Sequence, residues 1–356
     1  MLPRPDRPHD QLLMPMHRRM FTFAALVIAA GLVLVGCEPP ARDLATPPRR
    51  GHAPSLVKLA PPPPAPDLRG YAEVSADDYL VAAQGTQYAS FQTPDGLTCR
   101  IEATDAAAGC DGVLHGTPAP ANEVELFGHP RAALEVEPDA FRQTAKPQFG
   151  GVNGPGGSAP KTLPVGHKIV FGDFQCAAAA GAITACTRGS PAASWFVLSP
   201  AHSGIGPRTA GLPARFPDPH DFVVDDQSYI VGSGARNPFP LFTVASGLTC
   251  EIEIFSGGAF GCDGPLPGAP EGENEIYVDF SGRQVGMRKT DSPRFKTPQY
   301  PGTIRQLPAQ HRLDYTYETY TSCLATSDGG VACVADWQRH PQGFVVSSHA
   351  AWTFGG

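Results

Sequence analysis

Three kinds of polar residue recur in both halves of the sequence and are of the types used in acid–base and nucleophilic chemistry. They are Asp111/Asp263, His167/His311 and Ser199/Ser347. A carboxylate that orients an imidazole, which in turn activates a hydroxyl, makes a hydrolytic triad, whatever the order of the residues in the chain. Each type also has a structural use here, because Asp before Gly forms turns and Ser after an apolar strand ends the strand. The structural interpretation is favoured, and the sequence predicts no catalytic residue.

A second set of repeated polar residues offers candidates for contact with a ligand. These candidates are Asn122, Glu123, His167, Asn274, Glu275 and His311. An amide next to a carboxylate can recognise a sugar or a cation. A solvated strand edge explains the two Asn-Glu pairs equally well, so shared position in the two halves indicates common origin rather than use.

The sequence contains no catalytic, metal or cofactor motif. G-x-S-x-G, H-E-x-x-H, Walker and EF-hand patterns are all missing. The glycine-rich segment Gly150–Ser158 resembles a phosphate-binding loop only in composition, because Pro155 interrupts it and no GK[ST] sequence follows. We therefore expect a flexible loop there, no cofactor and no enzymatic activity.

Cys37 follows directly on a segment typical of protein export. Arg18 and Arg19 precede an apolar run from Phe21 to Gly36, which is short for a membrane span. The sequence Leu34-Val35-Gly36-Cys37 matches the lipobox of bacterial lipoprotein precursors. The match implies a signal peptide over residues 1–36, cleavage before Cys37 and fatty acyl chains on Cys37. An uncleaved anchor and an ordinary secretory signal are the alternatives.

Residues 37–70 are expected to form a tether. Its part from Glu38 to Pro66 is rich in proline and ends in the run PPPPAP, which favours extended polyproline conformations and buries little surface. The whole chain carries a formal net charge of −7, and residues 1–36 remove more basic than acidic side chains. An acidic chain of this kind is not expected to bind nucleic acid, so membrane attachment would come from the acyl chains on Cys37.

The other eight cysteines fall into four pairs. An even number of cysteines in an exported chain indicates disulfides, and zinc ligands are usually spaced more closely. The turn Ser327–Gly329 sets Thr326 opposite Gly330 and thereby Cys323 opposite Cys333, within reach of a disulfide. The predicted disulfides are Cys99–Cys110, Cys176–Cys186, Cys250–Cys262 and Cys323–Cys333.

The phrase GLTC…GCDG occurs twice, from Gly96 and from Gly247, and introduces an internal repeat. The other shared landmarks are Tyr79–Val81 with Tyr229–Val231, Phe91 with Phe242, Asn122–Val124 with Asn274–Ile276, Pro147–Phe149 with Pro298–Tyr300, Leu163–His167 with Leu307–His311, and Phe196–Ser199 with Phe344–Ser347. We therefore predict two tandem homologous domains, 71–211 and 212–356.

The fold class follows from short apolar runs separated by turn residues. Pro and Gly number 39 each, and no long amphipathic helical pattern is present. Each domain is predicted to be a small all-β sandwich or barrel with disulfide-stapled hairpins. Expected strands include 168–171, 195–198, 275–278 and 343–346. The segments 135–146 and 283–296 allow either a short helix or an additional hairpin.

Both repeats carry motifs seen elsewhere. In the first half these are Phe91–Gly96, Cys99, Cys110, Leu163–Gly166, Cys176, Cys186 and Phe196–Ser199; in the second they are Gly330–Cys333 and Gly343–Ser347. Together they resemble a family of small exported actinobacterial domains with the patterns F-x-SPSGN-x-x-C, L-x-x-G, G-V-x-C and G-F-x-L-S. The serine-rich opening is altered here, and Val244–Ser246 lacks the proline. The resemblance implies a mycobacterial or related cell envelope and brings no known activity.

The sequence thus predicts a lipoprotein on the extracytoplasmic face of the cell membrane, which presents two β domains for binding or a structural role. An unknown envelope protein or glycan is the expected partner. The alternative is an envelope hydrolase or wall-modifying enzyme with an unrecognised site, and a third hypothesis is regulation of an envelope protein by association.

Overall fold

The computed structural model describes most of the chain after the tether. The described residues are 64–83, 85–102, 107–127, 139–150, 159–225, 229–231, 239–253, 258–270, 272–281, 283–295, 302–316, 320–335 and 340–355. The predicted signal peptide, Cys37 and most of the tether lie outside them. The described residues all belong to one compact unit. None of the helices in the described part has the length and apolar character needed to cross a membrane.

The all-β prediction is confirmed. The first-half strands are β1 (Ala72–Val74), β2 (Leu80–Ala83), β3 (Thr86–Gln92), β4 (Thr98–Glu102), β5 (Ala107–Leu114), β6 (Ala121–Phe127), β7 (Ala140–Gln143), β8 (His167–Phe171), β9 (Phe174–Ala179), β10 (Ile183–Arg188), β11 (Ser194–Leu198) and β12 (Gly204–Gly206). Helical structure in the described residues consists of two short 3₁₀ turns, η1 (Ala76–Tyr79) and η3 (Pro219–Asp221).

The second half contains strands in matching order. They are β13 (Val223–Asp225), β14 (Ile230–Val231), β15 (Phe239–Thr243), β16 (Thr249–Glu253), β17 (Ala259–Asp263), β18 (Glu275–Asp279), β19 (Gln284–Arg288), β20 (His311–Thr316), β21 (Tyr320–Ala325), β22 (Val331–Ala335), β23 (Gln342–Val346) and β24 (Ala351–Phe354). All four runs predicted as strands lie within strands, namely β8, β11, β18 and β23.

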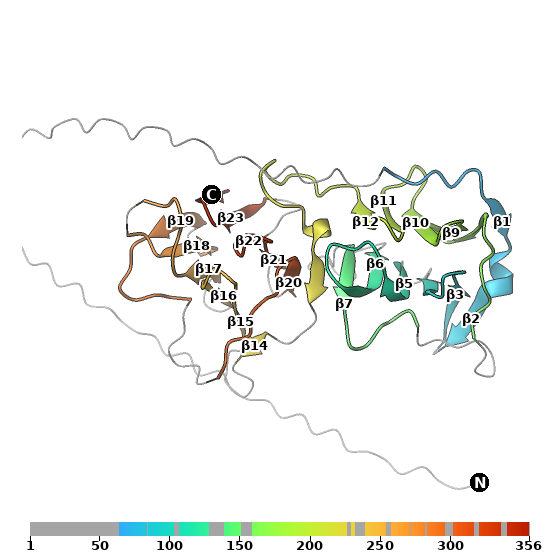
Figure 1. Cartoon of the computed structure of the whole chain (residues 1–356), viewed down its shortest axis with the longest axis horizontal. Coiled ribbons are helices and arrows are strands. Elements are labelled where there is room, and N and C mark those ends of the chain that lie inside the picture. Colours follow the sequence, from blue (N-terminus) through green and yellow to red (C-terminus); the bar gives the residue numbers. More distant parts are fainter. Residues whose placement is uncertain are drawn as a thin grey trace, which may run out of the picture. The chain divides into compact units, whose positions relative to one another are not determined.

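Each half is built from two facing sheets. In the first half, β2 to β7 form one series of neighbouring strands, and the order β1-β8-β9-β10-β11-β12 forms the other. In the second half, β14 to β19 form the first series and β13-β20-β21-β22-β23-β24 the second (Figure 1). The strand that opens each half, β1 or β13, lies parallel to β8 or β20. The division into two homologous domains stays a prediction, but strand order is the same on both sides of the predicted boundary.

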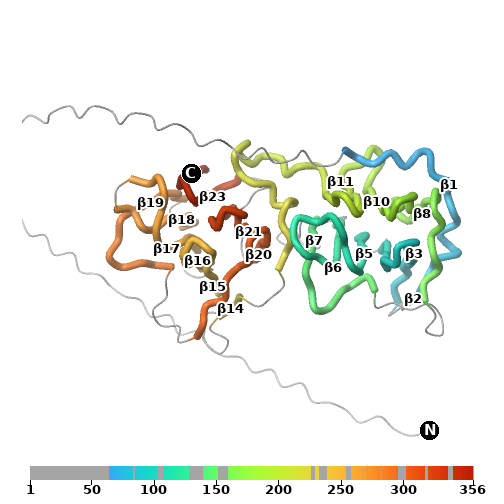
Figure 2. The backbone as a smooth tube through the Cα atoms, viewed as in Figure 1, coloured from blue at the N-terminus to red at the C-terminus, as the bar shows by residue number. Residues whose placement is uncertain are grey.

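Apolar side chains from both sheets of a half fill the space between them. The core of the first half includes Phe91 from β3, Phe141 from β7, and Phe174 and Phe196 from β9 and β11, all almost fully buried. Figure 2 shows the two layers as β3, β5 and β6 on one side and β8, β10 and β11 on the other. The second half has its own cluster, which includes Phe242, Phe260 and Phe344. Each half is thus a sandwich around one core.

One sheet continues across the predicted boundary. Strand β13 lies between β7 and β20 and is parallel to both, so twelve strands form a single sheet. The linker before β13 contains η3, where the Asp218 side chain caps the turn by accepting a hydrogen bond from the His220 amide. Sequence patterns local to each repeat gave no indication of this pairing.

Four disulfides staple neighbouring strands, and they are the four pairs that the sequence predicts. Cys99–Cys110 joins β4 to β5, Cys176–Cys186 joins β9 to β10, Cys250–Cys262 joins β16 to β17, and Cys323–Cys333 joins β21 to β22. The members of each pair are directly opposite in the ladder, with Cα atoms 4.0–4.1 Å apart. All eight cysteines are in the cores.

The two segments for which helix and hairpin were both open each contain a strand, β7 or β19, among their described residues. Strand β7 pairs antiparallel with β6, and β19 pairs antiparallel with β18. Arg283, just before β19, has a φ of 50°, which is a turn conformation. The second of these connections is therefore a tight hairpin; most of the corresponding loop before β7 lies outside the described residues.

Candidate functional site

The repeated Asp and Glu residues lie on the outer face of the first sheet in each half, and the repeated Asn residues lie near the start of β6 and just before β18. Together they hold a segment that we name the strap, Thr144–Gly150 in the first half and Thr290–Phe295 in the second. The amide group of Asn122 exchanges two hydrogen bonds with the backbone of Thr144, at 2.7 and 2.9 Å. Asn274 makes the same pair with Thr290, both at 2.9 Å. The two asparagines are therefore used as scaffold.

The repeated carboxylates hold the rest of each strap. Glu123 accepts a hydrogen bond from the Gln148 amide at 2.7 Å, and Glu275 accepts one from the Arg294 amide at 3.2 Å. Both glutamates are fully buried. Asp111 accepts from the amide of Gly150, which lies at the end of the first strap. Buried acceptors that meet backbone donors in this way fix the path of a chain segment.

Each strap places a phenylalanine ring on a glycine of the sheet. A Cβ atom on Gly109 would overlap the Phe149 ring and the Val124 carbonyl oxygen, and one on Gly261 would overlap the Phe295 ring and the carbonyl oxygen of the facing strand. Only glycine allows so close an approach. The two rings are almost fully buried, so each strap covers the outer face of its sheet with an apolar plug.

The structure corrects one landmark of the predicted repeat. The sequence match paired Pro147–Phe149 with Pro298–Tyr300, which lies outside the described residues. Pro293–Phe295 performs the same role instead, because Phe295 packs on Gly261 as Phe149 packs on Gly109. The connection from Glu275 to its partner Arg288 is shorter than that from Glu123 to its partner Arg142. This shortening displaces every later landmark.

Two arginines that the sequence analysis missed complete the straps. Arg288 lies 2.6 Å from a carboxylate oxygen of Glu275, and Arg142 lies 3.8 Å from Glu123 and 3.6 Å from Glu125. The shared pattern R-x-T-x-x-P-x-F, which begins at these two arginines, could have revealed them. The shorter match PQ[FY] obscured it.

The supposed triad residues have separate local partners. The ring of His167 meets the Val165 carbonyl oxygen at 3.1 Å, and His311 meets the Ala309 carbonyl at the same distance. Each ring thus contacts the backbone of the turn that leads into β8 or β20. The Ser199 hydroxyl donates to the His202 carbonyl at 2.6 Å, and that of Ser347 donates to Ala350 at 3.1 Å. Each of these side chains closes a turn.

Asp111, which binds the end of the first strap, has a perturbed pKa. Burial, together with the negative charge of Glu123 beside it, raises the pKa of the Asp111 carboxyl to about 7. The folded protein therefore holds the Asp111 proton over a pH range where the unfolded chain, with a pKa near 3.8, has released it. The stabilisation from this proton is complete below about pH 4 and is lost as pH rises through about 7.

Asp111→Asn is expected to reduce the fall in stability between pH 4 and pH 8. A difference of about three pKa units corresponds to at most about 4 kcal/mol of unfolding free energy. The variant should equal the wild type near pH 4 and exceed it at pH 8, as measured by urea unfolding at a series of pH values. Asp95→Asn, at an exposed position, is the control and should follow the wild type. If the unfolding free energy of Asp111→Asn fell with pH as steeply as that of the wild type, the raised pKa of Asp111 would be contradicted.

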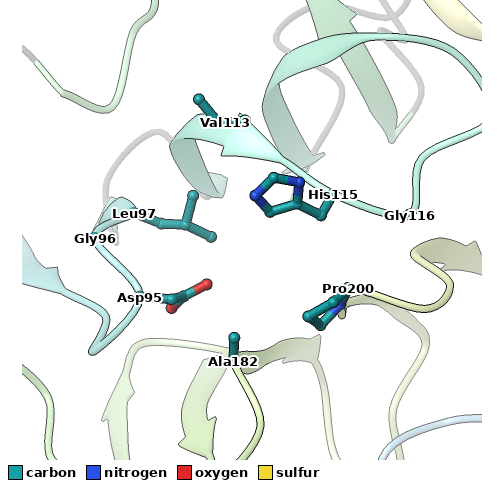
Figure 3. A pocket seen from close by; sticks show the side chains of 8 residues that line it. All are labelled: Asp95, Gly96, Leu97, Val113, His115, Gly116, Ala182 and Pro200. Carbon is teal, nitrogen blue, oxygen red and sulfur yellow. The ribbon is translucent and has the colours of Figure 1, made fainter.

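A separate cavity opens at one end of the first half, between the turns of its two sheets. Its volume is about 540 Å³. The lining residues are Asp95, Gly96, Leu97, Val113, His115, Gly116, Ala182 and Pro200. Figure 3 shows the Asp95 carboxylate and the His115 ring directed toward the same hollow, with Ala182 and Pro200 on its other side. A wall that combines apolar side chains with one carboxylate and one imidazole could bind a small polar ligand.

The matching end of the second half is closed by hydrogen bonds between its turns. The Ser246 amide donates to the Gly329 carbonyl oxygen at 2.9 Å. Asp328 accepts from the amide and the hydroxyl of Ser348, at 2.9 and 3.1 Å. Burial opposes ionisation of Asp328, but hydrogen bonds from Thr326, Ser348 and Gly330 hold its pKa below the usual value. The second half therefore has an ionised side chain that joins two turns.

The sequence explains why the first half stays open. Counting from the paired cysteines, Gly181 takes the place of Asp328, and counting from Ser199, Pro200 takes the place of Ser348. Glycine has no carboxylate, and proline has neither an amide hydrogen nor a hydroxyl. Both hydrogen bonds to the turn are thus impossible in the first half. The cavity is thus a local difference between two halves that share the same strand order.

Comparison with known proteins gives no relative. No model of a known protein family, no curated protein and no solved structure matches this chain. The argument for function therefore depends on the residues and geometry of this chain alone.

The two candidate places differ in what they can do chemically. The carboxylates of the straps are committed to backbone donors and arginines. Within the described residues, no group of three or more His, Cys, Asp or Glu side chains is placed to hold a metal ion. The cavity, by contrast, presents an exposed carboxylate and an exposed imidazole to solvent. It is the better candidate for a binding site.

Proposed function

We propose that this chain is a lipid-anchored lipoprotein of the extracytoplasmic face of the cell membrane, and that it binds a small polar ligand or envelope component at the open end of its first half. The observation that carries the binding proposal is the contrast between the cavity beside Asp95 and His115 and the closed end of the second half. An end that is open in one half and closed by hydrogen bonds in the other supports use of the open end.

The chemistry of the cavity limits the ligand. Its volume of about 540 Å³ is within the range of small-molecule sites. Asp95 can accept hydrogen bonds or meet a positive charge, and His115 can donate or accept. Leu97, Val113 and Pro200 supply apolar contact. A sugar unit of an envelope glycan, or a polar loop of an envelope protein, offers groups of these kinds.

The anchoring part of the proposal is supported by two independent features. The lipobox before Cys37 and the proline-rich tether after it have the order expected of a lipoprotein. The four disulfides fit an oxidising compartment, where such bonds form and persist. Acyl chains would hold the chain at the membrane, and the tether would let the folded part meet its ligand.

Val113→Trp tests the binding site. The larger side chain should fill the cavity, because Val113 lines it and is 72% exposed. We expect at least a tenfold loss of the envelope molecules that remain bound to the protein after purification from detergent-solubilised membranes, measured by mass spectrometry. His115→Ala should also reduce binding, since it removes the imidazole.

The control for this experiment is Val165→Trp. Val165 is also exposed, at 48%, and is not part of the cavity wall. This variant should retain the same bound molecules as the wild type. Thermal unfolding of all three variants shows whether they are folded. Equal retention by folded Val113→Trp would overturn the binding proposal.

An envelope hydrolase is the second candidate, favoured by the carboxylate and imidazole that share the cavity. The wall residues include no Ser, Cys or Thr, so a reaction here would use water as the nucleophile. His115→Ala separates the two candidates. Loss of hydrolysis of an isolated envelope glycan together with unchanged binding would favour the enzyme, and loss of binding alone would favour the ligand-binding lipoprotein.

A further inference from the structure

The contact between β7 and β13 is a sheet pairing between the two halves. Val223, Val224 and Asp225 lie opposite Phe141, Arg142 and Gln143. All three residues of β13 are buried, because β7 covers one edge and β20 the other. The edge of one half is thus completed by the opening strand of the other.

The same two edges occur once more, without this pairing. Strand order matches β19 with β7 and β1 with β13. Arg288 corresponds to Arg142, since each pairs with the equivalent glutamate, and Ala72 corresponds to Val223, since each lies opposite the equivalent histidine. Among the described strands, β19 pairs with β18 alone and β1 with β8 alone.

We propose that the chain associates head to tail with further copies of itself, with β1 of one molecule added beside β19 of the next in the register that β13 uses on β7. This register places Ala72 opposite Met287, Glu73 opposite Arg288, and Val74 opposite Lys289. Opposite charges at facing positions of neighbouring strands stabilise the pairing. The partner is a second copy because the complementary edge is already present in the same chain.

Charge also selects this pairing over the alternatives. Glu73 is exposed on β1, and Arg288 and Lys289 are exposed on and next to β19. Two β1 edges would bring carboxylates together, and two β19 edges would bring cations together. Charged side chains on edge strands are a known defence against pairing of like edges. In this chain the charges disfavour pairing of two β1 edges or of two β19 edges, but they favour pairing of β1 with β19.

The described residues that lead into β1 pack on the face of the sheet rather than beside its edge. Leu68 packs on Ala177 and Ala185, on the outer face of the second sheet. In the second half the linker does the same, since Phe222 packs in a cluster with Leu324 and Ala332 on the equivalent face. The described end of the tether, residues 64–70, thus packs on the same face as the linker, and the linker does not prevent β7 from pairing with β13.

Head-to-tail pairing of this kind does not close on itself unless the rotation between copies returns to the start. The contact is short, so it should be weak between free molecules. Inside the chain the linker supplies a high effective concentration, which separate molecules lack. We therefore expect association that grows with protein concentration and is strongest for molecules confined to one surface.

Disulfide trapping tests the register directly. Val74→Cys and Lys289→Cys are combined in one full-length chain in detergent, oxidised mildly and run on a non-reducing gel. The expected result is a ladder of dimers, trimers and longer species, because every molecule carries both edges. A mixture of the two single variants should give dimers only. The eight native cysteines are buried in disulfides and are protected from exchange.

Glu73→Cys with Lys289→Cys is the matched control. Residues 73 and 74 point to opposite faces of the strand, so this pair should be trapped at least tenfold more slowly. Equal rates for the two pairs, or monomers alone in the Val74 and Lys289 variant, would overturn the proposal.

A second test does not depend on whether the cysteine variants fold. Glu73→Lys should weaken self-association of the full chain in detergent at least tenfold, measured by sedimentation equilibrium, because it places a cation opposite Arg288. Lys168→Glu, on the neighbouring strand, should change association less. Wild-type protein that stays monomeric at millimolar concentration would also contradict the proposal.

Discussion

Phe295→Ala is expected to lower the free energy of unfolding by about 4 kcal/mol, a typical cost for removal of a fully buried phenylalanine. The ring is fully buried on Gly261, which has no side chain to replace it. The Phe295 amide also donates to Asp263 at 2.6 Å, so a displaced strap would leave a buried carboxylate without this donor. Urea unfolding followed by tryptophan fluorescence measures the loss.

Ile230→Ala is the control in the same half. Ile230 is 38% exposed, so its truncation should cost less than about 1 kcal/mol. Phe149→Ala should resemble Phe295→Ala, because the first strap has the same construction. A loss below about 1 kcal/mol for Phe295→Ala would show that the strap does not stabilise the sheet.

Cys37→Ala is expected to move nearly all of the protein from the membrane fraction to the soluble fraction. The substitution removes the sulfur that would carry the lipid. Each buried methylene of an acyl chain contributes about 0.8 kcal/mol, so loss of two or three chains abolishes attachment. Fractionation with immunodetection measures the change, and intact mass of the wild type should show acyl chains on a chain that begins at Cys37.

Glu38→Ala is the control for this experiment and should stay in the membrane fraction, because it keeps the lipobox. Membrane retention of Cys37→Ala with residues 1–36 still present would favour an uncleaved anchor. Either outcome leaves the cavity and the strand pairing unaffected, since both lie in the folded part.

The parts of the fold that follow local rules could be predicted from the sequence. The turn Ser327–Gly329 fixes the register of its hairpin, and this register brings Cys323 opposite Cys333, as the structure confirms. Apolar runs between turn residues likewise indicated β8, β11, β18 and β23. A short segment contains all the information needed for such elements.

Pairing between distant segments could not be predicted in this way. Val223–Asp225 is apolar enough to be a strand, but nothing near it in the sequence specifies β7 as its neighbour. The match of Pro147–Phe149 to Pro298–Tyr300 was wrong for a related reason. A shorter hairpin before the strap shifted the alignment. Phe295 is identified as the counterpart of Phe149 only because each ring packs on a glycine of its sheet.

Only part of the candidate site could be predicted from the sequence. Asn122, Glu123, Asn274 and Glu275 were identified as a repeated set, and the structure gives them structural partners. The cavity depends on turns from four places in the chain, and its cause is two substitutions that remove hydrogen bonds. Gly181 and Pro200 are visible in the sequence, but their effect is visible only once the turns face each other.

The order of the bridges also bears on how the chain acquires them. From Cys99 onward, every cysteine joins the next one along the chain or the one before it. If the polypeptide leaves a secretion channel N-terminus first, each newly arrived thiol meets at most one unpaired thiol of the folded part, and that one is its native mate. Oxidation during emergence would then give the native set without later reshuffling.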